Sequence, residues 1–218
     1  MNSSTLSSPA TLILIVSALG LLPLAIITMT AFIKISVVMF LLRNALGIQQ
    51  TPPNIILYAI ALILAFFIGG PTFQKAYDNI KDTNLNTSNF QDLLSAARQA
   101  GEPFREYLTK FTTQEERTFF LSATERLWPE GSRTEVSSSD FSILLPSFVI
   151  SELKRAFEIG FLIYIPFISI DLIVSAILLS LGMSQVPPIT LSVPFKLFLF
   201  VSLNGWPKLL HGLILGYT

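Results

Sequence analysis

Apolar residues gather at the two ends of the chain in four long runs, and a polar segment separates the second run from the third. The runs cover residues 12–33 (continuing beyond Lys34 to 42), 55–73, 159–183 and 189–206. A bilayer core about 30 Å thick needs about 20 apolar helical residues. Three runs reach that length and the fourth nearly does. The pattern predicts an all-α membrane protein with four long apolar helices in two hairpins.

Prolines lie inside all four runs, as Pro23, Pro71, Pro166 and Pro194. Proline removes a helical hydrogen bond and bends or breaks the helix. In lipid, neighbouring helices must then satisfy the freed backbone groups. We therefore expect kinked helices that pack against partner chains. Residues 144–147, which contain a further proline, predict a short separate apolar piece before the charged turn at 151–155 and the third run.

The polar middle, residues 74–142, contains eight basic and eleven acidic residues, against six and three in the rest of the chain. Apolar residues recur at helical spacing within it. One predicted helix begins at Pro103, a residue suited to a first helical position. The next follows a capping box formed by Thr113 and Glu116. We expect three regions: an apolar hairpin over 1–73, a small helical insertion over 74–142, and a second apolar hairpin over 143–218.

The short connections between apolar runs indicate an orientation. Residues 43–54 carry one base and no acid, and the uncharged connection 184–194 is followed by Lys196. Positive loops favour the cytoplasm, whereas long segments cross largely regardless of charge. The long polar middle is therefore expected outside. Residues 1–11 contain no Lys or Arg, so the positive start of a signal peptide is missing and the first run is expected to be retained.

The amino-acid composition narrows the range of possible functions. The 218 residues are 51% hydrophobic and 13% charged, where a soluble domain carries about 25% charged residues, and the net charge is zero. This disfavours a disordered chain, an ordinary soluble enzyme and a nucleic-acid binder. The absence of cysteine and the single histidine, His211, exclude thiolate sites and a histidine metal cluster. No phosphate-binding loop or nucleophile elbow is present, so no enzyme activity, cofactor or metal is predicted.

Three charges inside the apolar runs are the most informative residues. A charge at the bilayer centre costs about 2.5–3.5 kcal/mol on insertion scales and is usually paired or faces a cavity. We expect Asp171 and Lys196 to form an ion pair, within or between subunits, that supports assembly. Lys34 is a candidate for a further polar contact near the cytoplasmic edge. The alternative is a small-solute or ion transporter that uses Asp171 as its coupling carboxylate.

A break in the apolar pattern follows Gly182. Non-helical backbone between membrane segments is tolerated where protein buries it or where it lines a water-filled space. Met183, Ser184 and Gln185 are therefore candidates for a pore loop or gate. An ordinary hairpin turn is the other interpretation, and the pattern alone favours it.

Three stretches of this sequence resemble, in order, the signature motifs of the FliP/SctR family of type III secretion export apparatus proteins. The first is the hairpin sequence from Arg43 to Asn54. The second is Ala-Phe-Glu-Ile-Gly-Phe from residue 156, continuing to Asp171. The third joins Pro-Phe-Lys-Leu from residue 194 to Asn-Gly-Trp at 204–206. The resemblance covers both apolar ends, and the polar middle carries much less of it.

The resemblance implies a subunit of a bacterial inner-membrane export gate, more similar to the injectisome branch than to the flagellar one. In this family a pentamer assembles with two other small membrane proteins into a cone-shaped complex beside a larger export-gate protein. Unfolded secreted proteins pass through its centre. The middle segment is periplasmic in this family, and much of the complex lies outside the bilayer plane. Many members close the channel with consecutive methionines, whereas this chain has only Met183 there. A structural scaffold around another protein's pore is a further alternative.

Overall fold

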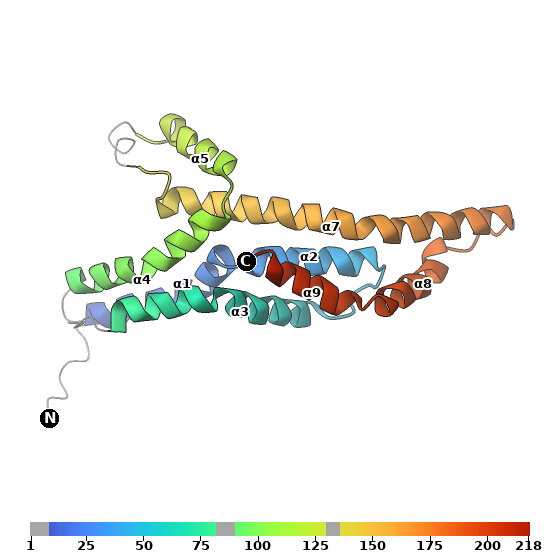
Figure 1. The fold of residues 1–218 in the computed structure, drawn as a ribbon, viewed down its shortest axis with the longest axis horizontal. Coiled ribbons are helices and arrows are strands. Elements are labelled where there is room, and N and C mark those ends of the chain that lie inside the picture. Colours follow the sequence, from blue (N-terminus) through green and yellow to red (C-terminus); the bar gives the residue numbers. More distant parts are fainter. Residues whose placement is uncertain (1–8, 82–89, 130–135) are drawn as a thin grey trace, which may run out of the picture. The chain divides into compact units, whose positions relative to one another are not determined.

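The computed structural model describes residues 9–81, 90–129 and 136–218, and every regular element in these ranges is a helix (Figure 1). The helices are α1 (Pro9–Met29), α2 (Phe32–Ala45), α3 (Asn54–Lys81), α4 (Phe90–Phe111), α5 (Gln114–Leu127), α7 (Phe141–Ser180), α8 (Pro188–Ser202) and α9 (Gly205–Leu215). In the described chain, α3 and α7 are each long and apolar enough to cross a membrane. The pairs α1–α2 and α8–α9 pass the same test as bent spans. The prediction of an all-α membrane protein is confirmed.

The first and fourth apolar runs each form two helices. In the first run, the Thr30 hydroxyl donates to the carbonyl of Ile26 at 2.5 Å and accepts from the amide of Phe32 at 3.3 Å. It thereby bonds to the last turn of α1 and to the first residue of α2. In the fourth run, Asn204 adopts a left-handed backbone with φ of 52°, and α8 and α9 meet at 62°. A left-handed residue cannot continue a right-handed helix, so the expected single helix ends there.

The prolines do not break the helices that contain them. Pro23, Pro71 and Pro194 lie inside continuous helices. Pro166 lies inside α7, which runs unbroken for 40 residues. Proline has a helical φ, and in a bundle of membrane helices neighbouring groups can satisfy the backbone carbonyl that its ring leaves without a partner. The helices are therefore not broken at these prolines, and the kinks expected there stay a prediction.

Two helices are longer than the sequence predicts. The separate apolar piece expected at 144–147 is wrong, because α7 passes without interruption through Pro146, the charged turn and the third apolar run. The helix start expected at Pro103 is also wrong, because α4 continues through Gly101 and Pro103. In both places the helical turns on either side continue through the local breaker residues.

Helix α5 begins where the sequence predicts, but another contact holds its start. Thr113 is the residue that caps the helix, and its side chain makes no capping bond to α5. Instead its amide donates to the hydroxyl of Ser151 on α7 at 3.1 Å, and the two hydroxyls are 3.1 Å apart. Ser147 donates to the carbonyl of Glu116 at 3.3 Å. Two serines of α7 thus attach the first turn of α5.

The chain forms two compact units, each described by itself. The first contains Met1–Phe32 and Phe66–Glu152, and the second contains Ile33–Ala65 and Leu153–Thr218. The core of the first unit is built mainly from α4 and the first turns of α7, with Leu108 and Phe148 fully buried. The core of the second joins α2, α7, α8 and α9. The earlier division into 1–73, 74–142 and 143–218 rests on polarity along the chain and stays a prediction.

The buried phenol of Tyr107 makes the stability of the first unit depend on pH. The Tyr107 ring packs against Phe148 at 5.9 Å between centroids. Burial, and then the charge of Glu152, raise the pKa of the Tyr107 phenol far above its usual 10.0. Above this usual value the unfolded chain loses the phenol proton while the folded chain keeps it. The folded state is then penalised, and stability falls as the pH rises.

We expect Tyr107→Phe to reduce the loss of stability between neutral pH and about pH 11, because it removes the group that titrates only on unfolding. Thermal unfolding of the detergent-solubilised chain, followed by circular dichroism at both pH values, measures this. Tyr77→Phe is the matched control, since Tyr77 is exposed. An alkaline loss equal in the Tyr107→Phe variant and the parent protein would contradict the assignment.

Candidate functional site

A buried ammonium group lies at the centre of the second unit. The amino group of Lys196, on α8, donates to Asp171 Oδ2 on α7 at 2.6 Å and to the backbone carbonyl of Ala45 on α2 at 3.0 Å. The side chain of Lys196 is 4% exposed, whereas that of Asp171 is 38% exposed. One side chain therefore connects three helices. The cation lies inside the protein, and the carboxylate lies at its edge.

The Ala45 carbonyl explains why a cation suits this position. Ala45 is the last residue of α2, where carbonyl groups lack partners within the helix and the helix dipole is negative. The Lys196 ammonium satisfies this carbonyl and is attracted by the helix end as well as by Asp171. A buried charge costs several kcal/mol of desolvation unless such partners are present. The contact is therefore a three-way arrangement rather than an isolated ion pair.

Apolar packing on either side fixes the two charged residues. Phe167 lies one turn before Asp171 on α7, and Phe200 lies one turn after Lys196 on α8; both belong to one buried cluster with Leu42 and Leu46. Helices α2 and α7 approach closely at Gly160, where a Cβ atom would overlap the side chain of Leu41. Close helix packing thus brings α7 within reach of the end of α2.

Lys34 is also buried, at 3% exposure. Its amino group lies 3.5 Å from the centroid of the Tyr217 ring, near the C-terminus. A cation over the face of an aromatic ring is attracted by the ring quadrupole, and more strongly where water is excluded. This contact joins α2 to the last residues of the chain. Whether Lys34 contributes to assembly stays a prediction.

The loop that holds Met183, Ser184 and Gln185 begins with a well-defined helix end. Gly182 has a φ of +75°, which favours glycine. The amide of Met183 bonds to the carbonyl of Leu178 at 2.9 Å, and that of Gly182 bonds to Leu179 at 3.1 Å. This is the Schellman arrangement that closes a helix. A turn follows, in which the amide of Val186 bonds to the carbonyl of Met183 at 3.2 Å.

Ser184 and Gln185 are the central residues of that turn, and both are exposed. The Met183 side chain is 44% exposed. Asp171 lies nine residues, or about 13 Å of helix, before the last residue of α7. The loop and the ion pair are therefore two separate features of the second unit. The expected gating role of Met183, Ser184 and Gln185 stays a prediction.

A second exposed loop, between α2 and α3, is held by a residue that sequence reasoning passed over. Arg43 donates to the carbonyl of Pro52 at 3.2 Å and to Asn54 Oδ1 at 2.6 Å, so it ties the end of the loop to its beginning. Gly47, with a φ of +74°, leaves no room for a Cβ against Val193 of α8. Arg43 and Asn54 bound the first signature motif, which was the available signal. Tyr217 and the Ala45 carbonyl gave no signal in the sequence.

Comparison with known proteins agrees with this architecture. Residues 15–213 match the model of the FliP family. The chain belongs to the FliP family. Across 207 residues it is 58% identical to "Probable translocation protein y4yL" of Sinorhizobium fredii, which covers 95% of this chain and 93% of that protein. It is 45% identical over 206 residues to "Yop proteins translocation protein R" of Yersinia pestis, with 94% and 95% covered.

A third relative is "Virulence protein YscR" of Salmonella typhimurium, 41% identical over 211 residues that cover 97% of this chain and 98% of the relative. These relatives are matched over almost their whole length. The FliP-family resemblance seen in three signature stretches therefore extends across the polar middle as well. The names of the relatives agree with the injectisome branch expected from the sequence.

Lys196 is buried and Asp171 is partly exposed. We therefore expect the two residues of the ion pair to affect the free energy of unfolding of this FliP-family chain unequally when each is removed. Asp171→Ala leaves the buried Lys196 cation without its anion and should lower the free energy of unfolding by about 2–3 kcal/mol. Lys196→Met leaves a carboxylate that water can reach, and should cost about 1–2 kcal/mol. The double variant Asp171→Leu, Lys196→Met should recover part of the loss.

Thermal unfolding of the purified chain in mild detergent measures these differences. Glu158→Ala is the matched control, because Glu158 lies exposed on the same helix. Equal losses from the two single variants, or strictly additive losses in the double variant, would show that the contact is not a coupled buried interaction.

Proposed function

We propose that this FliP-family chain is a non-enzymatic subunit of a type III secretion export gate. With sister copies and partner membrane proteins, it surrounds a passage for unfolded secreted proteins. The exposed turn at Met183, Ser184 and Gln185 carries the proposal. It is an uncharged, geometrically fixed loop between two apolar helices, as a constriction requires. Energy for transport is supplied elsewhere, since the sequence has no nucleotide-binding loop.

The relatives support the cellular role. One is named for the translocation of Yop proteins and another as a virulence protein. Membership of this family implies partners embedded in the same membrane. We propose a homo-oligomer, a pentamer as the family resemblance implies, joined by two other small membrane proteins and contacting a larger export-gate protein. The exposed apolar faces of α3, α7 and α8 provide surface for such contacts, with Phe67, Phe161 and Phe198 all largely exposed.

The proposed location is the bacterial inner membrane, with residues 74–142 on the periplasmic side. Charge supports this orientation, because Arg43 lies in the last turn of α2, no acid lies between it and α3, and basic residues beside short loops favour the cytoplasm. The polar insertion is long enough to cross regardless of its bases.

The contacts of Asp171 favour assembly over ion coupling. Its carboxylate accepts from Lys196, which also bonds the end of α2. The Asp171–Lys196 contact thus joins three helices, as an assembly contact does. A coupling carboxylate would instead need its own path to water, and Asp171 Oδ2 is occupied by the Lys196 ammonium. The transporter alternative is supported only by the partial exposure of Asp171.

The proposed seal at this loop differs from one made of consecutive methionines. Met183 is unbranched and adaptable, as a gasket side chain should be. Ser184 and Gln185 add a hydroxyl and an amide, which donate and accept hydrogen bonds. We propose closure by one methionine from each copy together with hydrogen bonds between turns of neighbouring copies.

A photo-crosslinking amino acid at Gln185 should form adducts with an export substrate stalled in the assembled apparatus, because the turn would face the passage. The same amino acid at Ser122, an exposed polar position on α5, is the control and should give few adducts. Immunoblotting of the substrate measures both. If Gln185 gives no more adducts than Ser122, the chain is a scaffold rather than a channel wall.

Asp171→Asn separates assembly from ion coupling. Asparagine keeps an acceptor for Lys196 but removes the negative charge, so we expect less of the assembled complex and a proportional loss of export. Co-purification of the partners and secretion by the same cells measure the two quantities. Normal assembly with export abolished would overturn the structural role and favour a coupling carboxylate.

A further inference from the structure

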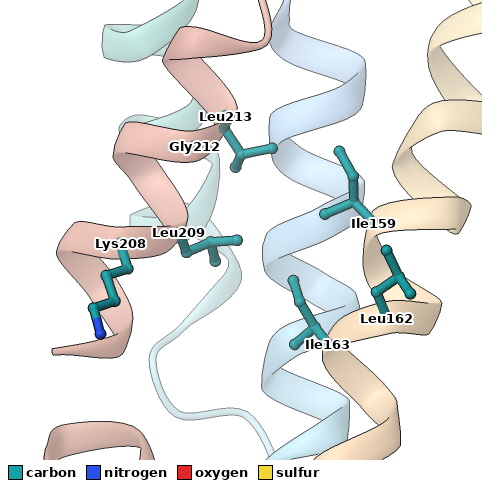
Figure 2. Close-up of a pocket in the computed structure, with 7 residues that line it drawn as sticks. All are labelled: Ile159, Leu162, Ile163, Lys208, Leu209, Gly212 and Leu213. Atoms are coloured by element: carbon teal, nitrogen blue, oxygen red, sulfur yellow. The ribbon is translucent and has the colours of Figure 1, made fainter. Parts of the chain in front are cut away.

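An apolar groove runs between α7 and α9 within the second unit. It has a volume of about 380 Å³ and is lined by Ile159, Leu162, Ile163, Lys208, Leu209, Gly212 and Leu213. Figure 2 shows Leu209 and Leu213 of α9 directed toward Ile159 and Ile163 of α7, while the Lys208 side chain extends away from them. Apart from Lys208, every side chain at this groove is aliphatic or, at Gly212, absent. The groove therefore suits a hydrocarbon chain with a polar end near Lys208.

A second hollow is also lined by Lys208. It has a volume of about 300 Å³ and shares Ile163, Lys208 and Leu209 with the first. Its remaining lining is largely apolar and includes Phe167 and Phe200. Two apolar hollows that meet at one cation match the form of a phospholipid, which has two acyl chains and one charged headgroup.

The excess of basic side chains in the second unit favours a lipid with an anionic headgroup. The second unit has six Lys and Arg side chains and only two side-chain carboxylates, Glu158 and Asp171. Asp171 is already bound by Lys196. Among the described residues, no carboxylate lies within salt-bridge distance of Lys208, which is exposed together with His211 on the next turn of α9. A basic residue at an apolar pocket between membrane helices is typical of sites for anionic lipid headgroups.

We propose that this groove binds an anionic phospholipid, with its acyl chains in the two hollows and its phosphate at Lys208. The long methylene stem of a lysine can cover apolar surface while its ammonium reaches a headgroup. Gly212 leaves the groove open, because a Cβ there would have no atom within 4 Å apart from its chain neighbours and the backbone of its own helix. The bound lipid would cover the α7–α9 face, which otherwise exposes aliphatic side chains.

The test uses the full chain, reconstituted in nanodiscs that contain equal amounts of phosphatidylglycerol and phosphatidylethanolamine, then released into mild detergent for native mass spectrometry. We expect the parent protein to retain phosphatidylglycerol. Gly212→Leu should lose most of it, because the new side chain fills the groove. Gly70→Leu is the matched control: Gly70 also has open space around it but lies on α3 in the first unit. It should retain lipid as the parent does.

Lys208→Gln tests the headgroup separately. It should lower the preference for phosphatidylglycerol over phosphatidylethanolamine about fivefold, and Lys208→Arg should restore it. Equal lipid retention by Gly212→Leu and the parent protein would overturn the site, as would an unchanged headgroup preference in Lys208→Gln. Loss of the lipid when sister copies assemble would show that protein, not lipid, occupies the groove, and would also overturn the proposal.

Discussion

The second unit depends on one buried ammonium group. The positive charge of Lys196 lies among apolar side chains, which disfavour a charge. The charge is tolerated because Asp171 and the last carbonyl of α2 both accept hydrogen bonds from the Lys196 ammonium. Three helices must be in register for the three groups to meet. Two features fix this register: the aromatic cluster around Phe167 and Phe200, and the close approach of α2 and α7 at Gly160. The contact is therefore a constraint on how α2, α7 and α8 pack, rather than a surplus of binding energy.

The second unit also has two exposed loops. One follows Gly182 and is closed by hydrogen bonds from Gly182 and Met183 to the end of α7. The other lies between α2 and α3 and is tied by Arg43. Both are uncharged at their tips; backbone hydrogen bonds close the first loop, and the Arg43 side chain holds the second. Such loops can serve a passage that must accept many different unfolded sequences, because uncharged hydrogen-bonding groups do not select for one side chain.

Large apolar side chains lie exposed on α7 and α8. Large side chains such as Phe161, Leu172 and Phe198 are mostly exposed in the isolated chain. Where exposed apolar side chains are contiguous, they mark a protein interface or a membrane contact. The α7–α9 groove with its single lysine differs from the rest of this surface, because it pairs apolar lining with an unbalanced charge. The proposed lipid site is thus separate from the apolar faces proposed for contacts with partner subunits.

The sequence by itself determined the helical class, the apolar runs, the polar insertion and the rarity of charges that singled out Asp171, Lys196 and Lys34, because hydropathy and charge are local properties. It did not place the helix breaks. Pro166 and Pro103 lie inside continuous helices, whereas Asn204 ends one, since backbone conformation there follows from packing on both sides. Only the tertiary structure decided that Ala45 offers its carbonyl to Lys196 and that Tyr217 covers Lys34. Those partners are more than 150 residues apart or carry no distinguishing side chain, so no local pattern could pair them.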